Sequence, residues 1–201
     1  MSESRDMFIR GESVVLRALR DEDLSGDWYR WFNDNDVTWF QNKGIFPNTF
    51  QKQEAFLRHL QSDASHVTLA IDVGGRHVGN VTLKDIDWVH RTAEIGIVIG
   101  DKSYWGKGLG NEAWWLMTRY GLLTLNLNKI TARIFAGNEN SLRVARRSGF
   151  VVEGEHAEQF YRHGEYHSLV MLGVTGKRWR ACFGADERAT FSQSAAPVES
   201  K

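Results

Sequence analysis

The stretch "SYWGKGLGNEAWW", residues 103–115, places three glycines within five residues and then continues as a run with helical character. Glycine lets a backbone turn sharply and keeps side chains out of its approach to a ligand. The first N–H groups of a helix lack partners inside the helix, and the helix dipole favours an anion beside them. The stretch therefore predicts a tight turn at the start of a helix, and it leaves open whether that turn binds phosphate.

The spacing of these glycines differs from two common nucleotide-binding motifs. A dinucleotide-binding turn, G-x-G-x-x-G, has two residues between its last two glycines, whereas "GKGLG" at 106–110 has one. A P-loop ends in Gly-Lys followed by Ser or Thr, which the sequence does not contain. These differences argue against a nucleoside-triphosphate enzyme. A flexible linker is also disfavoured, because apolar segments that must pack lie on both sides of the turn.

The composition is that of a globular protein without electrostatic bias. The 201 residues suit one domain, which we expect over 1–184, followed by a polar, disordered tail over 185–201. Lys plus Arg and Asp plus Glu total 25 each, which argues against nucleic acid or anionic membrane as partners. The single cysteine, Cys182, cannot form an internal disulfide, and no apolar run approaches the ~18 residues of a membrane span. Because the first residues also lack a signal peptide, we expect a cytoplasmic protein.

Hydrophobic periodicity predicts an α/β domain around the glycine stretch. A strand-like segment over 8–19 is followed by helix-like patterns, by three strand-like runs, and then by helices and strands in alternation. The later elements are expected as helices at 21–33, 50–62, 109–123 and 138–150, and as strands at 66–73, 77–87, 92–100, 129–136 and twice within 151–174. This order is typical of an α/β fold with a mostly antiparallel sheet.

Four segments together resemble the GNAT superfamily of acetyl-CoA-dependent N-acetyltransferases, in its RimJ/RimL-type branch. "WGKGLG" at 105–110 is similar to the family turn R/Q-x-x-G-x-G/A, with Trp105 in place of Arg or Gln. "NENSLRVARRSGF" at 138–150 is similar to the N-x-N-S…G-F helix of the branch. The opening at 9–38 and the closing hairpin at 153–174 are also similar, so the resemblance covers about residues 8–174.

The resemblance implies the fold and the cofactor. The expected fold is a mixed, mostly antiparallel sheet of six to seven strands, flanked by helices and splayed between the fourth and fifth strands. Acetyl-CoA is implied as co-substrate, with its pyrophosphate at the glycine turn and its pantetheine arm along the splayed strand. The implied cofactor-binding residues are Ile97, Val98, Ile99, Trp105, Gly106, Lys107, Gly108, Leu109, Gly110, Asn111, Asn138 and Ser141.

In this family a primary amine attacks the thioester directly in a ternary complex, and the amine must first lose a proton. Glu94 is the candidate base, because it lies in an apolar run at an interval from the glycine turn that resembles the family glutamate. A structural ion pair with Arg133 is the alternative role. The family tyrosine that protonates the leaving thiolate is replaced here by Ala145. The resemblance implies Ser141 as the acid instead, with helix capping or water as alternatives.

Aromatic residues near the segments expected to cover the acceptor site are candidates for substrate binding. They are Trp31, Trp39, Phe40 and Trp88. For most of the tryptophans the alternative role is packing in the core. The segment 28–49 is similar to a subgroup found with surface-polysaccharide enzymes, which favours an amino sugar, often nucleotide-linked, as acceptor. A protein N-terminus, a polyamine and an antibiotic remain as alternative acceptors. A CoA-binding regulatory module with little catalysis is the alternative function.

Metal and oligomer expectations complete the sequence interpretation. The seven histidines show no metal-ligand spacing, since His156, His163 and His167 lie on a turn-rich hairpin, so we expect no metal. A homodimer is expected only because members of the family commonly form dimers.

Overall fold

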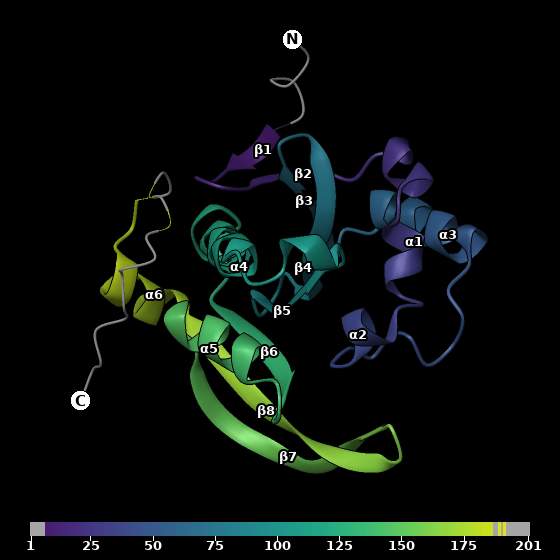
Figure 1. The fold of residues 1–201 in the computed structure, drawn as a ribbon. Coiled ribbons are helices and arrows are strands. Elements are labelled where there is room, and N and C mark those ends of the chain that lie inside the picture. The colour runs from purple at the N-terminus through teal and green to yellow at the C-terminus, as the bar shows by residue number, and fades with distance from the viewer. Residues whose placement is uncertain (1–6, 187–188, 190, 192–201) are drawn as a thin grey trace.

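Figure 1 shows a computed structural model of the chain, which describes residues 7–186, 189 and 191. Within these residues the centre is an eight-stranded sheet in the order β1-β2-β3-β4-β5-β6-β8-β7. Neighbouring strands are antiparallel except β5 and β6, which are parallel. The strands are β1 (Met7–Arg10), β2 (Val15–Ala18), β3 (Val67–Val73), β4 (Arg76–Asp87), β5 (Thr92–Ile99), β6 (Lys129–Phe135), β7 (Val151–Arg162) and β8 (Glu165–Thr175).

Helices cover both faces of the sheet. The α-helices are α1 (Trp28–Trp31), α2 (Asn35–Thr38), α3 (Phe50–Ser62), α4 (Leu109–Arg119), α5 (Glu139–Arg147) and α6 (Gly176–Phe183), with 3-10 turns η1 (Asp21–Ser25) and η2 (Lys102–Tyr104) and a π-helical turn η3 (Tyr120–Thr124). Figure 1 shows α4 on one side of β3 and β4, and α1 and α3 on the other. A large apolar cluster joins the sheet to α4, and a smaller one joins α1 to α3. No helix in the described part of the chain is long and apolar enough to span a membrane.

The α/β class with a mostly antiparallel sheet is confirmed, but the strand number is higher than expected. The predicted strand over 8–19 is a hairpin, β1 and β2, because the Gly11 N–H donates to the Val14 carbonyl at 2.9 Å and closes a turn. The buried carboxylate of Glu112 on α4 accepts from the backbone N–H of Ser13 at 3.1 Å. A Cβ on Gly11 would collide with that carboxylate, so the turn needs glycine there. The sheet thus has eight strands, not six to seven.

The helix expected over 21–33 is broken, whereas the helix expected over 50–62 is present as α3. Gly26 adopts an extended conformation and separates η1 from α1. Thr49 caps α3, because its hydroxyl accepts from the Lys52 N–H at 3.2 Å. Local capping therefore explains why this helix begins where the sequence indicates.

The segment after β8 forms a helix, α6, that the sequence interpretation did not include. Its Trp179 is 1% exposed and packs against Trp115 of α4, with ring centroids 5.3 Å apart. Most of the tail expected over 185–201 lies outside the described residues. Phe191, which is described, also packs on Trp115 at 6.0 Å, so at this residue the chain contacts the core.

A buried charge network ties η1 to the sheet. The guanidinium of Arg17 on β2 donates to Asp23 at 2.8 and 2.9 Å and to Asp72 at 2.9 Å. The side chains of Arg17 and Asp23 are 6% and 5% exposed. Burial alone would raise the pKa of Asp23, but hydrogen bonds from Arg17 and His77 outweigh it and hold that pKa well below its usual range. The native fold therefore favours the ionised carboxylate.

Replacing Asp23 with Asn should lower the free energy of unfolding by about 2 kcal/mol, because Arg17 loses one charged partner and keeps Asp72. The unfolded carboxyl titrates near ~3.9, so the stabilisation is complete above about pH 4 and is lost as the pH falls further. Urea unfolding at pH 7 and pH 3 measures both effects, and the difference between wild type and Asp23→Asn should shrink at pH 3.

Asp27→Asn is the matched control for this stability prediction. Asp27 forms an exposed ion pair with Arg30, with side chains 58% and 68% exposed, and such pairs contribute about 0.5 kcal/mol or less. Equal losses of stability in the two variants would contradict the importance of the buried network.

Candidate functional site

The parallel strands β5 and β6 separate within the sheet. They pair only at Thr92 with Lys129, Ala93 with Ile130 and Glu94 with Thr131. Beyond Glu94, β5 pairs with β4 alone, up to Ile99. The splay that was expected between the fourth and fifth strands therefore lies between β5 and β6, since the first predicted strand is a hairpin.

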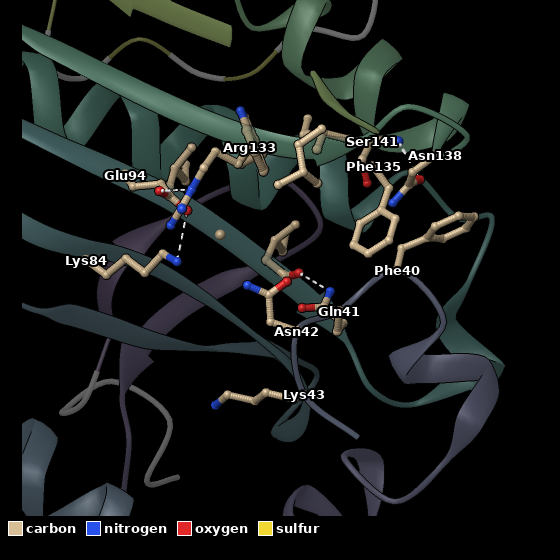
Figure 2. A pocket seen from close by; sticks show the side chains of 16 residues that line it. Phe40, Gln41, Asn42, Lys43, Lys84, Glu94, Arg133, Phe135, Asn138 and Ser141 are labelled. Carbon is tan, nitrogen blue, oxygen red and sulfur yellow. Dashed lines mark hydrogen bonds and ion pairs between the residues drawn. The ribbon is translucent and has the colours of Figure 1, made fainter. Parts of the chain in front are cut away.

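A cavity of about 190 Å³ opens at this splay (Figure 2). Its walls come from the loop after α2, from β4, β5 and β6, and from the beginning of α5. The lining residues are Phe40, Gln41, Asn42, Lys43, Lys84, Glu94, Ile95, Gly96, Ile97, Trp114, Arg133, Ile134, Phe135, Asn138, Ser141 and Leu169. Of the predicted site residues, the cavity brings together Glu94, Ile97, Phe40, Asn138 and Ser141.

Two side chains donate to backbone carbonyls on the open edge of β5. The Gln41 carboxamide donates to the Ile97 carbonyl at 3.2 Å, and Figure 2 shows it reaching across the cavity. The indole N–H of Trp105 donates to the Ile99 carbonyl at 2.8 Å. Because β6 no longer pairs with β5 here, these two carbonyls accept hydrogen bonds from side chains and not from the backbone of a neighbouring strand. The edge is therefore suited to hydrogen-bonding an extended ligand.

The glycine stretch forms the turn that the sequence predicts. Gly106 and Gly108 have φ values of +75° and +79°, a region that favours glycine. Gly108 is the N-cap of α4, and among the described residues no side chain caps this helix. The carboxamide oxygen of Asn111 in the first turn is buried without a hydrogen-bond partner in the described part of the chain. Because no side chain among the described residues caps α4, its first turn has the main-chain N–H donors that an anion such as pyrophosphate requires.

Lys107 and Trp105 flank this turn. The Lys107 ammonium lies 4.8 Å from the centre of the Tyr104 ring, which is a cation–π contact. The Trp105 side chain occupies the position of the family Arg or Gln and is held by its hydrogen bond to Ile99. Trp105 is 44% exposed, so it borders the turn from the solvent side.

The start of α5 contributes Asn138 and Ser141 to the cavity. Asn138 is the N-cap, and its side-chain oxygen accepts from the Ser141 N–H at 3.1 Å. The Asn138 side chain therefore caps α5. Ala145, at the position of the family tyrosine, is fully buried in the core.

Glu94 lies between two cations from neighbouring strands, as Figure 2 shows. One carboxylate oxygen pairs with the Lys84 ammonium at 2.9 Å, and the other accepts from Arg133 Nε at 2.7 Å. Its side chain is 15% exposed. The ion pair with Arg133 that was considered as an alternative is present, and Lys84 is a further partner that the sequence did not indicate.

The loop after α2 closes the other side of the cavity. Its residue Phe40 packs edge-to-face against Phe135 of β6, with ring centroids 6.0 Å apart. Buried Arg162 at the end of β7 donates to the carbonyls of Thr38 and Lys43 at 3.0 and 3.2 Å. The hairpin β7–β8 therefore holds this loop over the cavity.

Lys43, in this same loop, is an exposed residue whose ammonium lies 4.5 Å from the Phe32 ring centre and 4.3 Å from that of Phe56. Burial, and secondarily the charge of Lys84, lowers the pKa of Lys43. No carboxylate among the described residues pairs with it. Lys43 is thus a cation beside the cavity that lacks a counter-ion.

The other aromatic candidates lie away from the cavity lining. Trp31 is 6% exposed and packs on His77 at 5.0 Å, which is a core position. Trp39 stacks on His163 at 3.9 Å, and Trp88 donates to the Ala64 carbonyl at 3.2 Å in the turn between β4 and β5. Five of the eight tryptophans are buried, which agrees with core packing for most of them; they are Trp28, Trp31, Trp114, Trp115 and Trp179.

Comparison with known proteins gives consistent matches. Residues 13–151 match the family described as acetyltransferase (GNAT) domain. Spermidine N(1)-acetyltransferase of Escherichia coli K12 is 32% identical over 166 residues, which is 81% of this chain and 86% of that protein. The putative ribosomal N-acetyltransferase YdaF of Bacillus subtilis is 31% identical over 122 residues, 61% of this chain and 66% of that protein.

A solved structure supports the fold. Spermidine N-acetyltransferase from Vibrio cholerae, in complex with CoA and spermine, superimposes with a TM-score of 0.77 at 23% identity, covering 84% of this chain and 99% of that one. The family match covers the splayed pair of strands and the uncapped glycine turn, the two features that fit a CoA thioester. The chain therefore belongs to the GNAT family and is an N-acetyltransferase that uses acetyl-CoA.

Proposed function

We propose that this enzyme acetylates the primary amine of an acceptor that also carries negative charge, and that the acceptor is a nucleotide-linked amino sugar. The observation that supports this is the charge of the cavity. Its lining contains the cations Lys43, Lys84 and Arg133 but, among the described residues, only one carboxylate, Glu94. Because Glu94 already pairs with Lys84 and Arg133, positive charge remains for an incoming anion.

Lys43 is the cation best suited to a phosphate oxygen. Its ammonium contacts the Phe32 and Phe56 rings and pairs with no carboxylate among the described residues, and a phosphate group would supply a charged partner. A polyamine carries only positive charge and would meet like charges in this cavity, which disfavours binding. We therefore do not propose spermidine, which appears in the names of two relatives, as the acceptor of this enzyme.

Residue roles in the proposed reaction follow from the lining of the cavity. Glu94 accepts the proton that the acceptor amine must lose, since the described lining offers no other carboxylate and no histidine or tyrosine. The amine nitrogen then bonds to the acetyl carbon as the carbon–sulfur bond breaks, and the nitrogen loses its second proton while the sulfur gains one. The hydroxyl of Ser141, half-buried in the lining, is proposed to relay that proton, accepting it from the nitrogen as it donates its own to the sulfur. Phe40 forms the apolar wall against which the sugar ring packs.

The turn at 106–111 and the edge of β5 are proposed to hold acetyl-CoA. Their uncapped N–H groups and carbonyls suit the pyrophosphate and the amide groups of the pantetheine arm, respectively. Holding the two reactants together in this way can lower a reaction barrier by roughly 7–11 kcal/mol in well-oriented systems.

A thiol-release assay with a panel of amines tests the acceptor class. The panel contains UDP-linked amino sugars, the same sugars without nucleotide, a peptide with a free N-terminus, and spermidine. We expect kcat/KM to be highest for a nucleotide-linked sugar and at least tenfold lower without the diphosphate, since each tenfold step corresponds to about 1.4 kcal/mol. Spermidine as the best acceptor would contradict the charge argument. Acetyl-CoA binding without thiol release for any amine would indicate a regulatory module.

Lys43→Met should raise the KM for the nucleotide-linked sugar about tenfold and leave the KM for acetyl-CoA unchanged, because the loss of one phosphate contact costs about 1.4 kcal/mol. Steady-state kinetics with each substrate varied in turn measure both constants. Lys52→Met is the control, since the Lys52 ammonium donates to the Pro47 carbonyl and does not line the cavity. Equal effects in the two variants would argue against a specific contact at Lys43.

A further inference from the structure

Three potential metal ligands converge at the end of α3, away from the cavity. They are His59 and Asp63, one helical turn apart, and His66, which directly precedes β3. Their ligand atoms all lie within 4.8 Å of one another, and this is the one such group of three found in the described part of the chain. None of the three lines the cavity of the candidate active site.

The distances within this cluster are close to those of a bound ion. His59 Nε2 lies 3.2 Å from Asp63 Oδ2, and His66 Nδ1 lies 2.7 Å from the same oxygen. With metal bonds near 2.0–2.1 Å, two ligands of a tetrahedral zinc ion are about 3.3 Å apart. The two imidazole-to-carboxylate separations are thus close to this ligand spacing, and the third pair of ligand atoms lies within 4.8 Å.

The turn that carries the cluster is held in place by its neighbours. Asp63 accepts from the Ser65 N–H at 2.8 Å and from the Ser65 hydroxyl at 2.7 Å, both on Oδ1. The Ile86 N–H of β4 donates to the Ser65 carbonyl at 2.9 Å, and the Trp88 indole donates to Ala64 at 3.2 Å. The carboxylate is thus oriented through one oxygen while its other oxygen faces both imidazoles. Supporting contacts of this kind are what orient metal ligands in proteins.

We propose that His59, Asp63 and His66 bind a divalent transition-metal ion of the zinc type. Two imidazole nitrogens and one carboxylate oxygen suit zinc, cobalt or nickel better than magnesium or calcium, which prefer oxygen alone. The side chains are 59%, 19% and 24% exposed in that order, so water can complete the coordination. The site lies outside the acetyl-transfer cavity.

Isothermal titration of the tag-free full chain with zinc chloride at pH 7.5 tests this proposal. We expect one ion per chain with micromolar or tighter affinity, at least tenfold weaker binding in His59→Ala and in His66→Ala, and no binding of magnesium. Cobalt should give a visible absorption band that zinc abolishes. Circular dichroism and thermal unfolding in EDTA identify any variant that has not folded.

His156→Ala is the control for an exposed histidine elsewhere, and it should bind zinc as the wild type does. Millimolar affinity, or an equal loss in His156→Ala, would overturn the proposal. His59→Gln and His66→Gln provide less disruptive substitutions if an alanine variant is unstable. Unaltered zinc affinity in these folded glutamine variants would also overturn it.

Discussion

A Gly108→Val variant is expected to raise the KM for acetyl-CoA about 100-fold. Gly108 has a φ of +79° at the N-cap of α4, where a β-branched residue is strained. Relief of that strain would rotate the first N–H groups of α4 away from the turn. A 100-fold loss corresponds to about 2.7 kcal/mol, which is the scale of one or two hydrogen bonds to a charged group.

Gly74→Val separates backbone strain from cofactor binding. Gly74 lies in the turn between β3 and β4 and has a φ of +60°, and a Cβ added there would meet no neighbouring atom. Both variants should lower the melting temperature, but only Gly108→Val should change the KM for acetyl-CoA. Initial rates with acetyl-CoA varied at a saturating acceptor concentration give this constant. A folded Gly108→Val enzyme with the wild-type KM would show that the turn does not hold the cofactor.

The glycine turn could be predicted from sequence because its signal is local. Positive φ values at Gly106 and Gly108 and the start of α4 at Leu109 all follow from a few adjacent residues. The bounds of α3 were predictable for the same reason, since Thr49 caps it directly. The class of fold could be predicted from the hydrophobic periodicity of such segments, because each segment's pattern indicates a helix or a strand independently of the others.

Features that depend on distant contacts could not be predicted in this way. The hairpin at Gly11 depends on Glu112, about a hundred positions away, and the Gln41 contact depends on the Ile97 carbonyl on another element. Lys84 is the second cation beside Glu94 because the register of β4 against β5 places these two residues opposite each other. Sequence alone therefore predicted the glycine turn, Glu94 and, through Phe40, one residue of the loop that closes the cavity, but not the contacts that hold this loop in place.

The histidine cluster at the end of α3 has a local signal in the sequence. The spacing of His59, Asp63 and His66 is i, i+4 and i+7, which places three ligands on one side of a helix end. The expectation of no metal covered all seven histidines but was argued from those of the hairpin, which lie later in the chain, and it overlooked this spacing. This spacing brings the ligands together only if the helix ends between them. Helix α3 ends at Ser62, and Asp63 is its C-cap.

Glu94→Gln should reduce kcat about 100-fold near neutral pH without changing the KM for acetyl-CoA. A general base typically contributes a factor of 10² to 10⁴, and glutamine preserves the shape of the side chain but accepts no proton. Glu153→Gln is the matched control, because Glu153 is also an ion-paired strand glutamate, 2.7 Å from Lys129, and lies outside the cavity. It should retain the wild-type kcat.

The pH dependence of the deficit distinguishes proton transfer from positioning. An acceptor amine that is already neutral at high pH needs no base, so the kcat of Glu94→Gln should rise with pH as the fraction of neutral amine grows, and its deficit relative to wild type should narrow. If Glu94 only orients Lys84 and Arg133 through its two ion pairs, the deficit should be the same at every pH. Profiles of kcat from pH 6 to pH 10 with one acceptor decide between these roles, and a deficit that stays constant over this range would exclude Glu94 as the base.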